Sequence, residues 1–190
     1  GTITMNRFTF KPTPLEGVYV IEPKPIRDDR GFFERYFCTQ DFAEIGLQKP
    51  IMQINHSYTK GVGSIRGLHY QTPPYCETKI VRCFKGSIYD VAVDIRKDSP
   101  TFLQYLGIEL SEENGRYLYI PEGFAHGFQT LSDEAEILYL VTSPFNPQAD
   151  SGLNALDPTL SISWPLPLGH ISDKDKNAPL ITQEFKGILC

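Results

Sequence analysis

Long apolar runs, an excess of basic charge and closely spaced cysteine pairs are all missing from this chain of 190 residues. No apolar run approaches the length of about 20 residues that a membrane-spanning helix needs, and no basic and then apolar signal opens the sequence. The formal net charge of -5 argues against a general affinity for nucleic acid or anionic membranes, because such binders need a basic face. We therefore expect neither nucleic acid nor a membrane as a partner.

Cysteine is scarce, and its spacing predicts no framework of disulfides. The chain has four cysteines without a C-x-x-C pattern: Cys38, Cys76, Cys83 and Cys190. A domain of this length can bury a sizeable core and does not need disulfides for stability. The sequence therefore predicts reduced thiols in a cytoplasmic protein.

No linker or low-complexity run divides the chain, so we expect a single domain over residues 1–190. Residues 1–4, before the first methionine, are assigned no role. The last quarter is rich in Pro, Asp and Asn, which predicts extended segments and turns packed over the rest. Residues 176–190 are expected to form a C-terminal tail.

Helix signals are scarce as well, whereas strand signals are frequent. Thr39 is expected to cap one short helix that stops at Gly46. Elsewhere, short alternating runs rich in β-branched and aromatic residues are separated by turn formers, a pattern typical of a β-sandwich or barrel. The expected strands are Lys79–Phe84, Ser87–Ile95, Gln104–Leu110, Tyr117–Ile120, Gly123–Leu131 and Glu136–Thr142. The sequence thus predicts an all-β protein with one or few short helices.

Two motifs, residues 64–71 (SIRGLHYQ) and residues 121–128 (PEGFAHGF), carry most of the information. They resemble the two halves of the metal site of a cupin, a jelly-roll β-barrel. The cupin pattern has His-x-His and a Glu in its first half and Pro-x-Gly-x-x-His in its second. Here Gln71 stands in place of the second His and Lys79 in place of the Glu. Because an ammonium repels a divalent cation, we expect a cupin-type barrel with neither metal nor cofactor.

From about Tyr19 to about Pro179, the chain resembles the dTDP-4-dehydrorhamnose 3,5-epimerase family of nucleotide-sugar epimerases. The other matching runs are residues 29–33 (DRGFF), 53–55 (QIN), 79–82 (KIVR), 90–96 (DVAVDIR), 99–102 (SPTF), 164–165 (WP) and 172–175 (SDKD). The resemblance implies an isomerase that inverts C3 and C5 of a nucleotide-linked 4-keto-6-deoxyhexose. The expected reaction converts dTDP-4-dehydro-6-deoxyglucose into dTDP-4-dehydrorhamnose for deoxysugar and polysaccharide biosynthesis.

The resemblance assigns four catalytic residues. His69 matches the base, and imidazole titrates near neutral pH. Asp175 matches the carboxylate that orients this base, although on chemistry alone Asp173 would serve as well. Tyr139 matches the acid on the opposite face of the sugar, and Lys79 matches the cation near the keto oxygen. Without the resemblance, each has an ordinary structural alternative, most of all Tyr139, since a tyrosine in an apolar strand is usually a core residue.

The resemblance also assigns five residues to the diphosphate, the sugar and neighbouring groups: Arg30, Gln53, Asn55, Arg66 and His126. Arginine suits a diphosphate because its planar fork forms paired, charge-assisted hydrogen bonds. Strand alternation places His69 and Arg66 on opposite faces, so Arg66 can reach the site only from a bend at the start of the strand.

The chain departs from the family pattern at Arg35, Leu140 and Leu156, where many members have a carboxylate, Lys and Trp. The alternatives are therefore a C3-only or C5-only epimerase, or a keto-isomerase, on a related nucleotide sugar. A non-catalytic sugar-binding cupin and a metal-dependent cupin oxygenase are further alternatives. His69, Lys79 and Tyr139 argue against the first of these two, and Gln71 against the second.

The resemblance implies a homodimer in which an N-terminal segment pairs with the partner's sheet, and residues 18–21 (VYVI) suit that role. Aromatic residues make up 12% of the chain, more than one small barrel is expected to hide while it keeps a cavity open. Both observations predict a homodimer, and the resemblance implies a nucleotide-sugar substrate.

Overall fold

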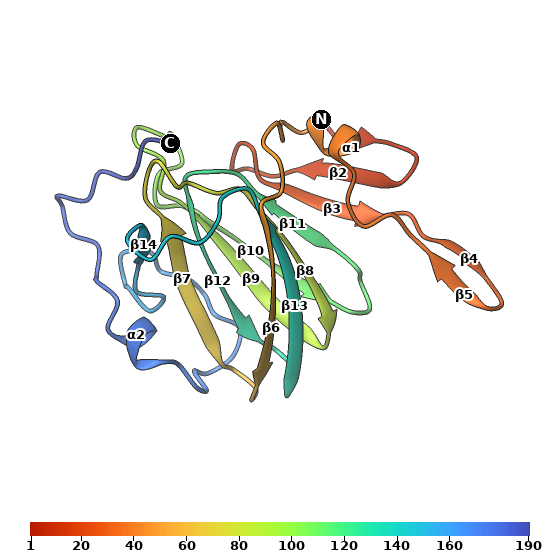
Figure 1. The fold of residues 1–190 in the computed structure, drawn as a ribbon. Coiled ribbons are helices and arrows are strands. Elements are labelled where there is room, and N and C mark those ends of the chain that lie inside the picture. The colour runs from red at the N-terminus through yellow and green to blue at the C-terminus, as the bar shows by residue number, and fades with distance from the viewer.

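Two antiparallel sheets face each other in the computed structural model, which describes residues 1–190 (Figure 1). The larger sheet has the order β1-β2-β3-β11-β8-β13-β6, and the smaller has the order β10-β9-β12-β7-β14. The strands of the larger sheet are β1 (Ile3–Thr4), β2 (Phe8–Pro12), β3 (Tyr19–Pro23), β6 (Gln53–Lys60), β8 (Lys79–Lys85), β11 (Tyr117–Ile120) and β13 (Glu134–Val141). The strands of the smaller sheet are β7 (Ile65–Gln71), β9 (Ser87–Asp94), β10 (Tyr105–Ser111), β12 (Phe124–Thr130) and β14 (Asp150–Gly152). This arrangement confirms the predicted all-β, cupin-type jelly-roll barrel.

All six strands predicted in the middle of the chain are present, as β8 to β13, with ends shifted by at most two residues. Strand β9 shows why its alternation was informative. Val91 and Val93 belong to an apolar cluster that includes Leu68, whereas Ala92 belongs to the cluster that includes Leu118. Both faces of β9 are therefore buried, and this strand forms part of the core between the sheets.

Gly86 lies at the turn that joins β8 to β9. Its φ of 70° lies in the left-handed region, which a residue with a side chain rarely adopts. A Cβ at this position would also collide with the carbonyl oxygen of Glu134. Glycine is therefore required for the tight connection between the two sheets.

The two helices are short, and neither is long and apolar enough to cross a membrane. The first, α1 (Thr39–Ala43), was predicted, and Gly46 ends its last turn with a φ of 101°. The prediction that Thr39 caps it was wrong. Cys38 is the N-cap, because its carbonyl already accepts the Phe42 N–H, and no side chain caps the helix. The second helix, α2 (Asp173–Lys176), was not predicted as a helix.

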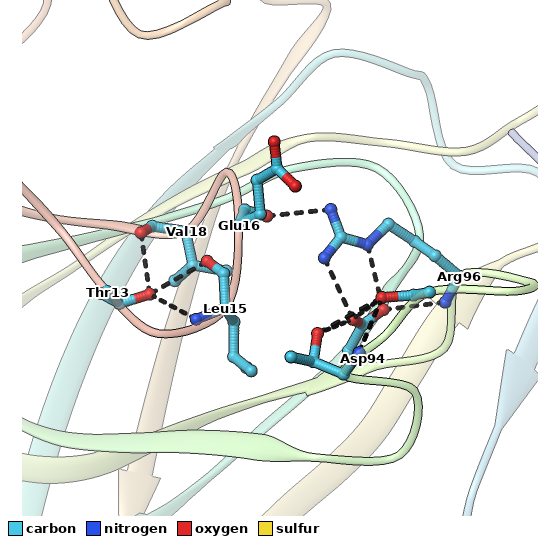
Figure 2. Close-up of polar contacts among 8 residues, drawn as sticks. Thr13, Leu15, Glu16, Val18, Asp94 and Arg96 are labelled. Carbon is cyan, nitrogen blue, oxygen red and sulfur yellow. Dashed lines mark hydrogen bonds and ion pairs between the residues drawn. The ribbon is translucent and has the colours of Figure 1, made fainter.

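A buried network around Asp94 ties the loop between β2 and β3 to the end of β9 (Figure 2). The Arg96 guanidinium donates two hydrogen bonds of 3.0 Å to the Asp94 carboxylate and one of 2.9 Å to the Glu16 carbonyl. Within the same loop, the Thr13 hydroxyl donates to the Val18 carbonyl at 3.0 Å. Burial raises the pKa of Asp94, but the hydrogen bonds to its carboxylate outweigh burial and lower it. The network holds the N-terminal strands against the barrel.

The C-terminal segment runs along the outside of the barrel as extended chain and turns, as predicted, apart from β14 and α2 (Figure 1). The prediction of four reduced thiols was wrong in one respect, because Cys76 and Cys190 form a disulfide. The tail folds back so that Ile188 exchanges backbone hydrogen bonds with Ile95 and Lys97, which brings the chain end to the loop before β8. Cys38 and Cys83 are free.

A hairpin of β4 (Ile26–Asp28) and β5 (Gly31–Phe33) projects away from the two sheets (Figure 1). Phe32 and Phe33 on β5 are 59% and 66% exposed. By contrast, β3 is hydrogen-bonded on both sides within its own chain, to β2 and to β11. The prediction that residues 18–21 pair with a partner's sheet is therefore wrong, because this strand has no free edge.

Candidate active site

A polar cavity of about 430 Å³ is lined by residues of β6, β7, β8 and β13, together with the segments that follow β7 and β13. Its walls are formed by Gln53, Asn55, His56, His69, Tyr70, Gln71, Glu77, Lys79, Tyr139, Val141, Ser143, Phe145, Asp150 and Lys174. Strand β7 belongs to the smaller sheet, and β6, β8 and β13 belong to the larger one. The cavity therefore presents side chains from both sheets to whatever it binds.

His69 on β7 forms a close pair with Asp175, whose carboxylate accepts a hydrogen bond of 2.7 Å from His69 Nε2. The imidazole is 37% exposed and the carboxylate 8%. Because an ionised carboxylate can only accept, Nε2 carries the hydrogen and Nδ1 keeps a lone pair. The pair therefore gives His69 a fixed orientation and a free basic nitrogen.

Local structure around Asp175 explains how the carboxylate is aimed inward. Ser172 is the N-cap of α2, and its hydroxyl accepts the Asp175 N–H at 3.2 Å. The second carboxylate oxygen of Asp175 accepts the backbone N–H of Gly67 at 3.0 Å. Burial raises the pKa of Asp175, but the bonds from His69 and Gly67 outweigh it and lower the pKa below its ordinary value. Asp175 is therefore an ionised partner of the imidazole at neutral pH.

Gly67 is required at this point of β7. Its φ is 121°, and a Cβ would lie 2.7 Å from the Cα of Gly127 on β12. The pairing of β7 with β12 is irregular here, with a register shift between His126 and Phe128. The irregularity aims the Gly67 N–H at Asp175, as a β-bulge commonly re-aims a group beside an active site.

Tyr139 and Lys79 contribute to the wall of the cavity from the larger sheet. Tyr139 lies on β13, where it pairs with Asn55 of β6 and Val81 of β8. Burial raises the pKa of the Tyr139 phenol above its ordinary 10.0, and the charge of Glu77 adds to the increase. Lys79 opens β8, and its Nζ lies 5.8 Å from the centroid of the Tyr139 ring. The cavity therefore combines a protonated phenol with an adjacent ammonium.

Gln53 and Asn55 are two positions apart on β6, so their side chains lie on the same face of the strand, and both line the cavity. Gln53 Nε2 donates to Asn55 Oδ1 at 2.9 Å, and Gln53 Oε1 accepts the Phe145 N–H at 3.1 Å. Neutral amide groups held in this way can donate to and accept from a sugar or a phosphate.

Three of the predicted binding residues do not line the cavity of their own chain: Arg30, Arg66 and His126. Arg30 lies on the projecting hairpin and pairs with Asp28. Arg66 donates to Thr59 Oγ1 and the Tyr58 carbonyl, because it points to the other side of β7 from His69, as strand alternation predicted. His126 lies directly beside His69 in the pairing of β12 with β7, but it is buried and bonded to Asp90 at 2.7 Å.

The family model described as dTDP-4-dehydrorhamnose 3,5-epimerase matches residues 12–183. The chain belongs to this family. It is 48% identical over 167 residues to a dTDP-4-dehydrorhamnose 3,5-epimerase of Shigella flexneri, across 87% of this chain and 91% of that protein. It is 46% identical over 173 residues to the enzyme of that name from Salmonella typhimurium, across 90% and 94%.

Solved structures agree with this membership. One is a dTDP-6-deoxy-D-glucose-3,5-epimerase from Legionella pneumophila Philadelphia 1 in complex with dTDP-4-keto-L-rhamnose. It is 40% identical, with a TM-score of 0.87 over 91% of this chain and 92% of that one. Another is a 3'-monoepimerase from Streptomyces bikiniensis in complex with dTDP-quinovose. It is 33% identical, with a TM-score of 0.83 over 89% and 86%. These similarities therefore show that the chain has the epimerase fold and that it is an isomerase.

The site of this epimerase contains charged residues that the sequence analysis missed. Glu77 lies two positions before Lys79, so strand alternation could have placed both on one side. Lys174 neighbours Asp175 and pairs across the cavity wall with Asp150, at 2.7 Å. No sequence signal pointed to Asp150, because it comes from the short strand β14 in a segment that was read as irregular.

No group of three or more His, Cys, Asp or Glu side chains has the arrangement of a metal site. Gln71, in the place of a cupin histidine, uses its amide to hold loops: Nε2 donates to the Tyr75 carbonyl at 2.9 Å and Oε1 accepts the Asn146 N–H at 2.8 Å. Residues that could hold a cation in a metal cupin thus have other partners in this epimerase.

Proposed function

We propose that this epimerase inverts C3 and C5 of dTDP-4-dehydro-6-deoxyglucose to give dTDP-4-dehydrorhamnose. The observation that carries the proposal is the placement of a carboxylate-oriented histidine on one sheet and a half-buried phenol with an ammonium on the other, around a single cavity. Such an arrangement provides a base and an acid on opposite sides of a bound ring.

The chemistry follows from the keto group at C4 of the sugar. His69 removes the proton from the neighbouring carbon, and the electrons of the C–H bond move onto the carbonyl oxygen to form an enolate. The Lys79 ammonium stabilises the negative oxygen. Tyr139 then donates its hydroxyl proton to the opposite face of the same carbon, which restores the carbonyl with inverted configuration. Solvent returns a proton to Tyr139 and removes one from His69.

The experiment is to incubate the enzyme with dTDP-4-keto-6-deoxyglucose in deuterated water and locate the label by NMR. We expect deuterium at both C3 and C5 and a product with both centres inverted. Label at one carbon only would replace the proposal with a monoepimerase, and absence of label would remove enolate chemistry altogether.

A monoepimerase is the second candidate, because the chain is 33% identical to the solved 3'-monoepimerase structure. Leu140 and Leu156 stand where many family members have Lys and Trp, and Leu140 directly follows Tyr139. The labelling experiment separates the two candidates, since only a 3,5-epimerase incorporates deuterium at both C3 and C5.

Asp175→Asn should slow inversion by at least about tenfold, but by less than removal of His69, because the amide misorients the base without deleting it. Asp173→Asn is the matched control, since Asp173 is exposed on the same helix. If the control is the more damaging change in a steady-state assay, the orienting carboxylate is Asp173.

The same variant has a signature in stability. Because the folded-state pKa of Asp175 is below its ordinary 3.8, its ionised form stabilises the fold above that pH. This contribution is lost as the pH falls through the lowered pKa. The difference in unfolding free energy between the parent and Asp175→Asn should therefore vanish in acid.

For substrate binding, we propose Gln53 and Asn55 in the cavity, with Arg66 and His126 acting from behind its walls. A cytoplasmic location fits a nucleotide-sugar substrate and remains our proposal. The Cys76–Cys190 disulfide is the observation against it, since such bonds are rare in that compartment.

We also propose a homodimer in which the β4–β5 hairpin carries Arg30 to the cavity of the partner subunit. Two observations support this: Arg30 is 87% exposed at the side chain and outside its own cavity, and the hairpin exposes Phe32 and Phe33. The outer face of the larger sheet adds an apolar groove. It is lined by Tyr36, Phe37, Ile51, Ile54, Leu138 and Leu140. Exposed apolar surface of this kind favours association.

Mixing two inactive variants tests the exchange of Arg30. Arg30→Ala and His69→Ala homodimers should each be nearly inactive, and subunit exchange between them should restore about a quarter of the parental sites, because one site in each mixed dimer is intact. Light scattering at micromolar concentration checks the dimer itself. A monomer, or a mixture no more active than its parts, would contradict the arrangement.

A further inference from the structure

Glu77 is a buried carboxylate in the active-site cavity to which the proton transfers above assign no role. Its side chain is 12% exposed, and its Oε1 lies 3.6 Å from Nζ of Lys79, whose side chain is 10% exposed. Glu77 is the one carboxylate that lies within 4.0 Å of the Lys79 ammonium. An ammonium buried to this extent is costly unless a counter-charge accompanies it, and Glu77 supplies that charge.

The backbone on both sides of Glu77 is fixed. The Thr78 N–H donates to Thr142 Oγ1 at 2.9 Å, and the Thr78 carbonyl accepts the Thr142 N–H at 3.3 Å. On the other side, Cys76 is joined to Cys190. Because this segment is constrained, the Glu77 carboxylate has a fixed position and can restrain the long and flexible side chain of Lys79.

The Lys79 ammonium lies 3.6 Å from the Glu77 carboxylate and 5.8 Å from the centroid of the Tyr139 ring. Burial and then the charge of Glu77 raise the pKa of Tyr139, and Arg66 opposes them. Burial raises the pKa of Glu77, Lys79 opposes this, and Asp150 adds to it. On the histidine side, burial lowers the pKa of His126, the charges of Lys79 and His69 add to the decrease, and Asp90 opposes it.

We propose that Glu77 is a positioning residue, which holds the Lys79 ammonium at the cavity wall beside Tyr139 and so keeps the acid side of the site assembled. This inference rests on the proposed roles of Lys79 and Tyr139. It assigns to Glu77 no contact with the substrate.

Glu77→Gln is the direct test, because the amide keeps the shape of the side chain and removes its charge. We expect kcat to fall about 10- to 100-fold, as misplacement of a catalytic group by about 1 Å can do, with KM for the dianionic substrate unchanged or lower. The alkaline limb of the kcat profile should move to lower pH, because the Glu77 charge that helps to raise the pKa of Tyr139 is gone. A merely structural Glu77 would lower thermal stability without moving this limb.

Two comparisons sharpen the test. Glu77→Asp keeps the charge and should restore the alkaline limb toward its parental position. Glu113→Gln removes one negative charge from an exposed turn and should leave kcat and its pH profile unchanged. Circular dichroism and calorimetric binding of dTDP verify that each variant is folded with an intact nucleotide site.

A double-mutant cycle with Lys79→Met decides whether Glu77 acts through Lys79. If it does, adding Glu77→Gln to Lys79→Met should change kcat less than about twofold. A parental kcat and pH profile for Glu77→Gln, or additive losses in the double variant, would overturn the inference and leave the role of Lys79 intact. Parental activity of Lys79→Met alone would instead overturn the role of Lys79, and the positioning role of Glu77 with it.

Discussion

Replacing His69 by alanine should abolish exchange of the sugar C–H hydrogens with solvent while dTDP still binds. The imidazole is the group that takes the proton from carbon, and its partner Asp175 lies too far back in the protein to replace it, behind the ring at 2.7 Å from Nε2. Because a base acts on the transition state and not on the bound nucleotide, the loss should fall on kcat, by at least about 10²- to 10⁴-fold. Deuterium incorporation followed by NMR measures it.

His170→Ala is a matched control, since His170 is exposed and outside the cavity. It should exchange and invert the substrate like the parent. If His69→Ala still exchanges within about tenfold of the parent, a barrier change of only about 1.4 kcal/mol, His69 is not the base.

Tyr139→Phe should separate exchange from inversion. The ring and its packing remain, but the proton that must reach the opposite face of the enolate is gone. His69 can still remove and return the C–H proton, so deuterium should enter the sugar without net epimerisation. In the parent, the raised pKa of Tyr139 keeps the phenol protonated up to and beyond pH 10.0, so inversion should decline only above that pH.

Tyr105→Phe controls for the loss of a hydroxyl elsewhere, because Tyr105 accepts the Ser163 N–H at 3.0 Å on the far side of the smaller sheet. Both variants should lose some thermal stability, but only Tyr139→Phe should change the ratio of exchange to inversion. If Tyr139→Phe inverts its substrate at close to the parental rate, the phenol is not the acid.

The sequence was most informative where side-chain alternation and burial agree. Strands β8 to β13 could be placed within two residues because their apolar positions repeat every second residue and glycine turns such as Gly86 separate them. The N-cap of α1 was misplaced because a hydroxyl residue next to a helix resembles a cap whether or not its backbone has already turned. The Cys76–Cys190 disulfide could not be predicted, since 114 residues separate the two cysteines and only the path of the tail brings them together.

Prediction of the site had a different limit. The resemblance pointed to His69, Lys79 and Tyr139, and all three line one cavity. It could not indicate that Arg30 lies on a hairpin away from its own cavity, because a motif records which residue is present but not where the fold places it. Asp150 was missed for a related reason: its pairing with Lys174 exists only in three dimensions.

The proposed base and acid lie on different sheets, His69 on β7 and Tyr139 on β13. Their separation is therefore set by the thickness of the apolar layer between the sheets, which is about 10 Å in packed β-sandwiches, and not by any flexible loop. The same methyl groups that stabilise the barrel also determine how large a ring fits between the two proton-transfer groups. A core substitution that widens this apolar layer should therefore move His69 away from Tyr139 and slow inversion, even where the substituted residue lies outside the cavity.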